Sequence, residues 1–446
     1  MGSEWRIGTL RDALGEKGYI RGPFGSALRR PELKTNGIPV YEQQHAITGT
    51  REFRFYIDEQ KYQSMKRFAV QPDDLIVSCS GTLARVSMIC SDDPIGIISQ
   101  ALLILRPDKT VVWPKYLYYF MSSKRGYDSL TGVSTGSVQV NIARRSIIEK
   151  TELPLPPLPE QHAIAHILGS LDDKIELNRR MNQTLQAMAR AIFKHWFIDF
   201  EFPNENGESY KSSGGEMIDS PLGPIPVGWR VGFINDIEFE IVPGDWGKGE
   251  LSERYSSPVR CIRGADIREI SSGGIGNPPL RYIKPLSAEV KSLRDTDVVV
   301  EISGGSPTQQ TGRAMRIIEP ITKKFAENLI CSNFCKLLRF RNIEDSEFTY
   351  FLLDNLYRRE IMFQYENGTT GIKNLDFKNL FSTEQVVIPN RKVLQQFAGY
   401  SRQIDSMIQL NGIQNMMLSR IRDSLLPKLM SGEIRVPVSD KEVDQF

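Results

Sequence analysis

The chain has few of the residues that metal sites and disulfide frameworks require. Its 446 residues include four histidines and five cysteines, and the cysteines form no CxxC pair. An odd number of scattered cysteines is typical of free thiols in a reducing cytoplasm. His162 and His166 have the spacing of a zinc pair on a helix, but no third ligand accompanies them. We therefore expect no metal site.

Long apolar runs and nucleotide-binding loops are also missing. No apolar run reaches the roughly 18 residues that a membrane-spanning helix needs, and the first residues lack the apolar core of a signal peptide. The phosphate-binding pattern GxxxxGK[ST] does not occur. These absences predict a cytoplasmic protein with no membrane contact and no NTPase site. The net charge of +2 says little about a nucleic-acid partner.

Two short motifs suggest chemistry but lack the residues that would complete it. Residues 277–280 read Asn-Pro-Pro-Leu, whereas amino-methyltransferases carry an aromatic at the position of Leu280 to stack on a flipped base. We interpret this segment as a turn. Asp73 and Asp74 are not followed by the acidic-x-Lys element of a nuclease. Asp297 matches them in the second half, which favours a structural role before a strand.

What the sequence does contain is a long internal repeat. Asn141 matches Asn374, and the same offset of 233 residues then joins Asp172 to Asp405 and Leu185 to Leu418 without gaps. The match continues more loosely upstream, where Trp5 answers Trp229 and Asp74–Val77 answers Asp297–Val300. A period above 200 residues indicates duplicated domains. The chain therefore reads as domain, helix, domain, helix, with a pseudo-two-fold relation between the repeats.

The globular halves alternate short β-rich runs with turns and a few helices, a pattern of the α+β (mixed α/β) class. We expect strands at Leu75–Ser78, Ala101–Leu105, Val298–Ile302 and Phe334–Leu338, and helices at Pro114–Ser122 and Glu347–Phe363. The expected domains are 1–155 (first recognition domain), 156–200 (central helix), 201–224 (exposed linker), 225–390 (second recognition domain), 391–437 (distal helix) and 438–446 (tail).

Two stretches, Pro159–Phe197 and Lys392–Leu429, predict long helices with a heptad-like apolar stripe. Pro427 should kink or end the second one. If the helices pair antiparallel as a coiled coil, their midpoints meet and Asn178 contacts Asn411. The alternative is that each helix packs on its own domain. The expected seam comprises Ile164, Leu171, Ile175, Asn178, Leu185, Ile404, Ile408, Asn411 and Leu418.

Polar, glycine-rich loops recur at matching places in the two halves. Arg, Asn, Gln, Ser and Thr are the side chains that contact base edges and phosphates. Each loop alone could be an ordinary solvated turn, but the recurring set suggests DNA contacts. The candidates are Ser80, Thr82, Arg85, Ser137, Gln139, Asn141, Arg144 and Arg145 in the first half, and Ser303, Gln309, Gln310, Arg313, Thr370, Lys373, Asn374 and Lys378 in the second.

Several segments resemble the specificity (S) subunits of type I restriction-modification systems. Leu153–Gln161, which leads into the first long helix, and Leu171–Asn178 resemble their central conserved region. Leu425–Ile434 resembles the end of their distal conserved region, and Ile262–Ile267 an early element of their recognition domains. Val387–Arg391 departs from the pattern, because the second helix lacks the Pro-Pro-Leu-Pro-Glu-Gln run before it.

The resemblance implies a non-catalytic chain that binds double-stranded DNA. Each target recognition domain would read one half of a split, asymmetric site, and the helices would set the gap between the halves. Two methyltransferase subunits and, in the full complex, two restriction subunits would dock on the chain. S-adenosylmethionine, ATP and Mg²⁺ would belong to those partners, which would form an adenine-N6 DNA methyltransferase and an ATP-dependent endonuclease.

Two other functions remain open from the sequence. The first is a stand-alone DNA-binding regulator with the same fold. The second is a coiled-coil scaffold that binds proteins and no DNA, although a scaffold has no need for two matched sets of polar loops.

Overall fold

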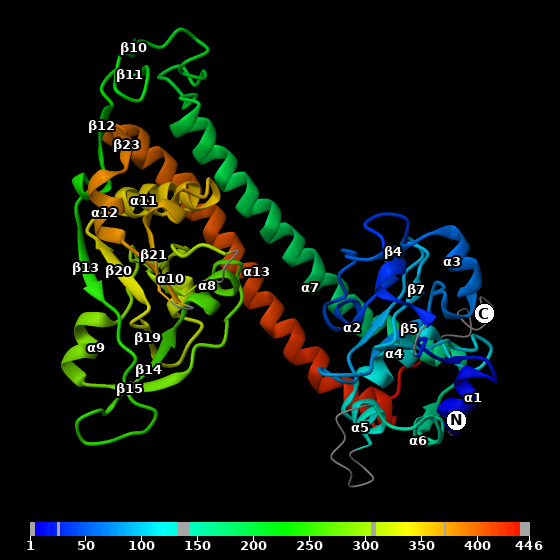
Figure 1. Cartoon of the computed structure of the whole chain (residues 1–446). Coiled ribbons are helices and arrows are strands. Elements are labelled where there is room, and N and C mark those ends of the chain that lie inside the picture. Colours follow the sequence, from blue (N-terminus) through cyan, green and yellow to red (C-terminus); the bar gives the residue numbers. More distant parts are fainter. Residues whose placement is uncertain (1–4, 25–26, 133–141, 305–308, 370–371, 438–446) are drawn as a thin grey trace. The chain divides into compact units, whose positions relative to one another are not determined.

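The computed structural model describes residues 5–24, 27–132, 142–304, 309–369 and 372–437. The chain divides into two compact units. Unit 1 comprises Met1–Asp173 and Leu418–Phe446, and unit 2 comprises Lys174–Met417. Figure 1 labels many of the elements of each unit. None of the helices in the described ranges is long and apolar enough to cross a membrane.

Unit 1 is built on a four-stranded antiparallel sheet and a smaller three-stranded one. The larger sheet has the order β2 (Tyr19–Arg21), β8 (Leu102–Leu105), β5 (Leu75–Ser78), β6 (Val86–Met88). The smaller has the order β4 (Tyr56–Ile57), β3 (Ile38–Tyr41), β7 (Ile97–Ile98), in which β3 and β7 are parallel. A separate antiparallel pair joins β1 (Arg6–Thr9) to β9 (Glu152–Leu155).

Both faces of the large sheet of unit 1 are covered. Successive side chains of a strand point to opposite faces, so Leu75 and Val77 join one apolar cluster with Tyr116 and Phe120, while Ile76 joins another with Tyr41. The helices of this unit are α1 (Leu10–Leu14), α2 (Gln43–Thr48), α3 (Glu59–Ser64), α4 (Pro114–Ser122), α5 (Lys124–Thr131) and α6 (Arg145–Ile148).

Unit 2 repeats the same strand orders. Its four-stranded sheet runs β13 (Phe239–Pro243), β20 (Cys335–Phe340), β16 (Val298–Glu301), β18 (Ala314–Arg316). The three-stranded sheet runs β15 (Leu280–Ile283), β14 (Ser257–Ile262), β19 (Asn328–Cys331), again with its last pair parallel. β12 (Arg230–Phe233) pairs with β23 (Gln385–Ile388) as β1 pairs with β9. The predicted duplication and the mixed fold class are therefore confirmed.

Unit 2 also contains strands that have no counterpart among the described residues of unit 1. A three-stranded sheet has the order β17 (Ser303–Gly304), β22 (Ile372–Leu375), β21 (Glu366–Thr369), and its first strand follows directly after β16. β10 (Met217–Ile218), which lies in the predicted linker, pairs with β11 (Ile225–Pro226), which lies just beyond it. The helices are α8 (Gly264–Ser271), α9 (Pro285–Lys291), α10 (Glu319–Thr322), α11 (Ile343–Arg358) and α12 (Phe377–Thr383).

The segmental predictions hold best where the signal is local. The strand Leu75–Ser78 and the helix Pro114–Ser122 occur with the predicted bounds. The helix expected at Glu347–Phe363 begins and ends earlier, as α11. Its first turn is polar and carries no apolar signal that would have predicted its start, and a 3-10 helix at Ile361–Tyr365 replaces its predicted end.

The acidic residues before β5 and β16 have the structural role that the sequence suggested. Asp74 accepts hydrogen bonds from Arg106 at 2.7 and 2.8 Å and from the backbone N–H of Gln71 at 2.7 Å. Asp297 is held in the same way by Arg339 at 3.1 and 3.0 Å. Burial raises the pKa of both carboxyls, and the arginines oppose that rise. Each ion pair thus anchors the start of a central strand.

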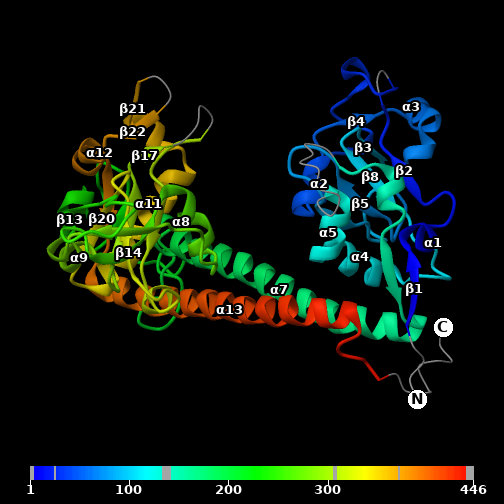
Figure 2. The same cartoon turned by 90° about the horizontal axis from the view of Figure 1, so that it is seen from below.

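The two long helices are α7 (Leu158–Phe193) and α13 (Arg391–Ser431). A π-helical turn over Lys194–Ile198 follows α7. Pro427 does not end α13, which continues to Ser431. Figure 2 shows both helices along their length.

The helices run antiparallel within each unit. In unit 2, Asn178 Nδ2 donates to Asn415 Oδ1 at 2.8 Å, and Asn411 Nδ2 donates to Asn182 Oδ1 at 2.8 Å. In unit 1, Arg422 bonds Asp172 at 2.6 Å. The predicted Asn178–Asn411 contact is wrong by one helical turn. Asn178 contacts Asn415, which lies one turn after Asn411, and Asn411 contacts Asn182, which lies one turn after Asn178.

The expected seam residues differ in burial. Three of the apolar ones, Ile164, Ile175 and Ile408, are buried, and Asn178 is fully buried. The others are half-buried: Leu171, Leu185, Ile404, Asn411 and Leu418.

Candidate nucleic-acid interface

In unit 1 the candidate residues gather at one end of the four-stranded sheet. The register pairs Arg21 with Leu103 and Ser78 with Leu102, so β2 and β5 end at the same edge. Ser80, Thr82 and Arg85 lie in the turn from β5 to β6. The backbone N–H of Ile142 donates to the carbonyl of Cys79 at 3.4 Å, which brings the segment before Arg144 to this edge.

Hydrogen bonds within the β5–β6 turn fix its backbone and leave its tip free. Ser78 Oγ donates to the carbonyl of Thr82 at 2.6 Å and accepts from the backbone N–H of Arg85 at 2.9 Å. Ser80 Oγ donates to Gln43 Oε1 at 3.0 Å. The side chains of Thr82 and Arg85 remain exposed. A preorganised loop of this kind loses little conformational entropy on binding.

A shallow groove of about 430 Å³ continues the same edge of unit 1. Arg144 and Arg145 line it together with Arg21 and Arg67, two cations that lie outside the recurring polar loops of the sequence. Arg145 also bonds Glu149 at 2.8 Å, so part of its charge is compensated. The only sequence signal for Arg21 is its place at the end of a strand. Ser137, Gln139 and Asn141 lie outside the described residues.

In unit 2 the two predicted loop sets meet directly. β17 pairs with β22, so that Ser303 faces Asn374, and their side chains are hydrogen bonded. Lys373 bonds Glu366 at 3.0 Å and lies 4.7 Å from the ring of Phe363. Figure 2 shows β17, β21 and β22 grouped together. Residues 71 positions apart thus form one surface at the end of β16.

Other candidates of unit 2 are engaged in the fold. Arg313 forms a bidentate ion pair with the buried Glu301 at 2.8 and 2.7 Å, and this bond raises the pKa of Arg313. Gln310 is buried and donates to the carbonyl of Tyr357. Gln309 is exposed, and Lys378 is exposed on α12. Thr370 lies outside the described residues.

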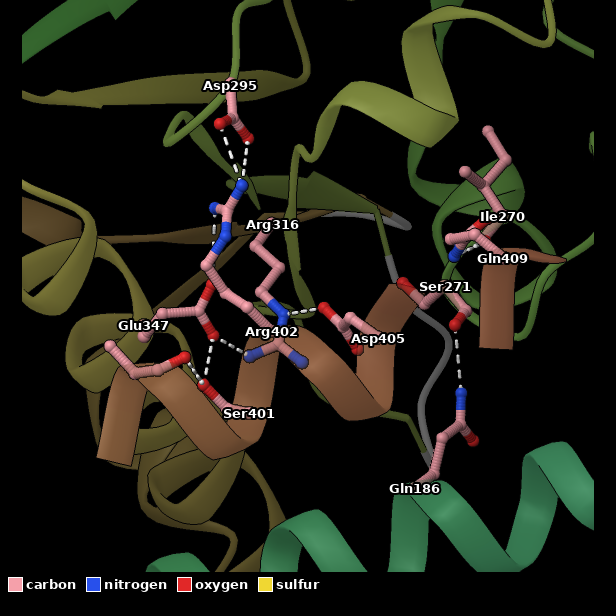
Figure 3. Close-up of polar contacts among 11 residues, drawn as sticks. Gln186, Ile270, Ser271, Asp295, Arg316, Glu347, Ser401, Arg402, Asp405 and Gln409 are labelled. Carbon is pink, nitrogen blue, oxygen red and sulfur yellow. Dashed lines mark hydrogen bonds and ion pairs between the residues drawn. The ribbon is translucent and has the colours of Figure 1, made fainter. Parts of the chain in front are cut away.

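A buried polar network fixes α13 to the globular part of unit 2 (Figure 3). Arg316 donates to the carboxylates of Glu347 and Asp405 and lies 4.6 Å from the ring of Tyr350. Ser401 Oγ donates to Glu347 at 2.7 Å. Burial raises the pKa of Glu347, although Arg316 lowers it. Removing one partner from such a network leaves an uncompensated buried charge.

Side chains of both long helices hold the last residues of α8 and the loop after it. Gln186 donates to the carbonyl of Ser271 at 3.0 Å, and Gln409 donates to that of Ile270 at 3.2 Å (Figure 3). Asn182 donates to the carbonyl of Ser272 at 3.0 Å. Gly412 permits the close approach, because a Cβ there would lie 1.8 Å from the carbonyl oxygen of Gly273.

The described residues contain no group of three or more His, Cys, Asp or Glu side chains that could hold a metal ion. His162 packs edge-on against Trp113. Four of the five cysteines are buried, and burial raises the pKa of Cys79 to about 12. A thiol with so high a pKa is a poor nucleophile.

Comparison with known proteins gives a consistent result. Residues 25–187 match the family described as the type I restriction modification DNA specificity domain. The specificity subunit of the type I restriction enzyme MjaIX from Methanocaldococcus jannaschii is 27% identical over 385 residues, which cover 82% of this chain and 81% of that protein. The specificity subunit of the HindI enzyme from Haemophilus influenzae is 24% identical over 398 residues, covering 76% and 81%.

A solved structure shares the fold. The type I restriction-modification S subunit from M. genitalium superposes with a TM-score of 0.53 at 16% identity, covering 96% of both chains.

Proposed function

The chain belongs to the specificity subunits of type I restriction-modification systems, and we propose that it reads a split, asymmetric DNA sequence, one half through each unit. One observation carries the proposal. Equivalent ends of the two four-stranded sheets both gather polar side chains, yet those side chains differ. Unit 1 presents Thr82 and Arg85, whereas unit 2 presents Ser303 and Asn374. Because base edges are distinguished by donor and acceptor patterns, different side chains should select different half-sites.

The candidate residues divide into two roles under this proposal. Exposed side chains would contact DNA, and engaged ones would hold the loops in place. Arg85, Arg144, Gln309, Asn374 and Lys378 are exposed, which fits contact with phosphates or bases. Arg313 and Gln310 fit the positioning role, since their polar groups are already bonded within the fold.

The helices would serve as spacer and docking surface. We assign residues 1–155 and 225–390 to the two recognition domains, and 156–200 and 391–437 to the helical segments. Type I specificity subunits assemble with methyltransferase and restriction subunits and bind DNA. For this chain we propose two of each partner, which would supply S-adenosylmethionine, ATP and Mg²⁺ for adenine-N6 methylation and ATP-dependent cleavage. The chain itself would contribute no catalytic group.

Methylome sequencing tests the proposal. A host without other adenine methylation would express the chain with its cognate methyltransferase, and the expected result is methylation at one split motif that disappears without the chain. Arg85→Gln should relax only the first half-site, and Ser303→Ala with Asn374→Ala only the second.

The matched control is Arg125→Gln, an exposed arginine on α5 that pairs with Glu152 at 3.1 Å. It should leave the motif unchanged. Methylation that does not depend on this chain would contradict the proposal, as would a single contiguous motif.

A further inference from the structure

An exposed aromatic side chain follows the first strand of the large sheet in both units. Phe24 is 63% exposed and Trp246 is 37% exposed. Each stands two residues after a glycine, Gly22 or Gly244, at the end of β2 or β13. The sequence does not reveal that these segments are equivalent, because Phe24 and Trp246 are different residue types and the two repeats match only loosely in this region. Single exposed aromatics are common, but an exposed aromatic at the same place in both repeats needs a reason.

The two glycines hold these segments against the sheet. A Cβ at Gly22 would lie 2.1 Å from the carbonyl oxygen of Ser99, and one at Gly244 would lie 1.9 Å from that of Ser332. The backbone N–H of Gly22 donates to Leu102 at 2.9 Å. Close backbone packing therefore fixes the backbone position of each aromatic residue, at the same end of the sheet as the polar loops.

A guanidinium accompanies each ring. Arg21 lies 5.8 Å from the ring centroid of Phe24, and Arg281 lies 4.6 Å from that of Trp246. Arg281 Nε also donates to the carbonyl of Trp246 at 2.8 Å. Arg21 Nη1 is buried without a hydrogen-bond partner among the described residues. A guanidinium has five donors, so both arginines keep donors for an anionic ligand.

The surroundings of Phe24 favour such a ligand. The groove that Phe24 lines contains Arg21, Arg67 and Arg144 besides the paired Arg145, and none of the described residues that line it carries a carboxylate. Trp246 is set in a loop with Lys248, which lies 5.9 Å from the ring of Tyr255. The nearby Asp245 is already paired with Lys291 at 2.8 Å. Aromatic faces beside Arg21, Arg144 and Arg281, for which the described residues supply no carboxylate partner, match a ligand that combines flat rings with phosphates.

We propose that Phe24 and Trp246 stack on bases of double-stranded DNA, one in each half-site, while Arg21 and Arg281 contact the neighbouring phosphates. The inference rests on the proposed function and adds a kind of contact to it. Apolar side chains inserted at base steps unstack and bend DNA, and aromatic stacking on bases tolerates sequence. The rings would therefore add affinity and local distortion, while the polar loops select the bases.

The test uses the chain in complex with its methyltransferase subunits and short duplexes that carry the motif found by methylome sequencing. 2-Aminopurine replaces one base at a time across each half-site, because its fluorescence rises when it is unstacked. Besides the target adenine, which the methyltransferase itself flips out of the stack, we expect enhanced fluorescence at one further position per half-site. Phe24→Ala should abolish this signal in the first half-site only, and Trp246→Ala in the second only, because alanine leaves neither a ring nor an apolar wedge. Each variant should lose about 5- to 100-fold in affinity.

Variants that restore a ring show whether stacking is responsible. Phe24→Tyr and Trp246→Phe should bind within about 3-fold of the natural chain, an allowance well below the stacking contribution. Arg21→Gln should lower the slope of log affinity against log salt by about 1. Tyr127→Ala and Tyr400→Ala are matched controls, since both tyrosines are exposed and lie outside these loops.

The outcomes separate the two proposals. A natural complex that fails to bind any duplex overturns the proposed function. A natural complex that binds its motif, together with alanine variants that fold, bind equally and leave the fluorescence unchanged, overturns the stacking inference alone.

Discussion

Asn178 donates a hydrogen bond of 2.8 Å to Asn415 at the junction of the two long helices. The equivalent bond from Asn411 to Asn182 has the same length. Asn178, Asn182 and Gln409 are buried here. Polar pairs in an otherwise apolar seam cost stability but define one register, because any slip leaves buried amides without partners.

Asn178→Leu should destabilise the helical junction by about 1–3 kcal/mol, since Asn415 loses its donor inside the seam. Replacing both residues by leucine should cost less than the sum of the single changes. Urea unfolding of the four variants in a double-mutant cycle measures the difference. Arg179→Ala, at an exposed position of the same helix, is the control and should have little effect. Additive effects would contradict a direct Asn178–Asn415 interaction.

Gly412→Ala should loosen the loop after α8. The new Cβ would meet the carbonyl oxygen of Gly273, and the resulting shift would strain the bonds from Asn182 and Gln186, at a cost of about 1–3 kcal/mol. Hydrogen exchange in residues 270–274 should accelerate. Gly399→Ala in the same helix is the matched control, because, its own helix backbone and chain neighbours aside, no atom of the described residues lies within 4 Å of its Cβ position. That control should be neutral or stabilising by up to about 1 kcal/mol. Equal behaviour of the two variants would rule out the close contact.

Glu160 should make the stability of unit 1 depend on pH. Burial raises its pKa, but hydrogen bonds from Arg435 and Trp5 outweigh burial and hold the pKa below its ordinary value of 4.5. A folded-state pKa below the unfolded value stabilises above the unfolded pKa, and this contribution is lost as pH falls through the folded pKa.

The measurement compares Glu160→Gln with the natural chain by urea unfolding at several pH values. Glu160→Gln should be less stable at pH 7, and the difference should shrink below the ordinary pKa of 4.5. Glu176→Gln alters an exposed ion pair and should show little of this trend. A difference that stays constant down to low pH would exclude the charged contact as its source.

The helices should determine the gap between the half-sites. Deleting one heptad from α7 with the facing heptad of α13 shortens each helix by about 10 Å, which equals roughly three base pairs of DNA. Methylome sequencing should find a changed gap and two unchanged half-sites. Replacing exposed residues of the same heptad by alanine keeps its length and should keep the gap. Altered half-sites would argue against separate reading and spacing.

Local patterns predicted the framework of this fold well. The buried run Leu75–Ser78 and the amphipathic segment Pro114–Ser122 carry their own signal, and both occur with the predicted bounds. The heptad-like apolar stripes likewise predicted two long helices, and the pseudo-two-fold relation of the repeats predicted that they run antiparallel. Side-chain partners were harder, because they depend on strand register and helix crossing. Arg313 looked like a free cation until β16 and β18 placed it against Glu301.

The candidate interface shows the same division. Ser303 and Asn374 were selected from separate loops, and the pairing of β17 with β22 brings them together. Arg21 and Phe24 were missed, because the repeat has a different offset in this region and the aromatic changes to Trp246. Only the matching strand orders of the two units reveal that these residues occupy equivalent places.

The crossed asparagine bonds have a consequence for how such a chain can be assembled. The offset of 233 residues turns the Asn178–Asn415 bond into the Asn411–Asn182 bond, so exchanging the repeats leaves the pair of bonds unchanged. An isologous contact of this kind is the same whichever repeat comes first in the chain. The contacts between the two helices therefore do not depend on the order of the repeats in the chain. A permuted gene that encodes the second recognition domain before the first would keep the same asparagine hydrogen bonds.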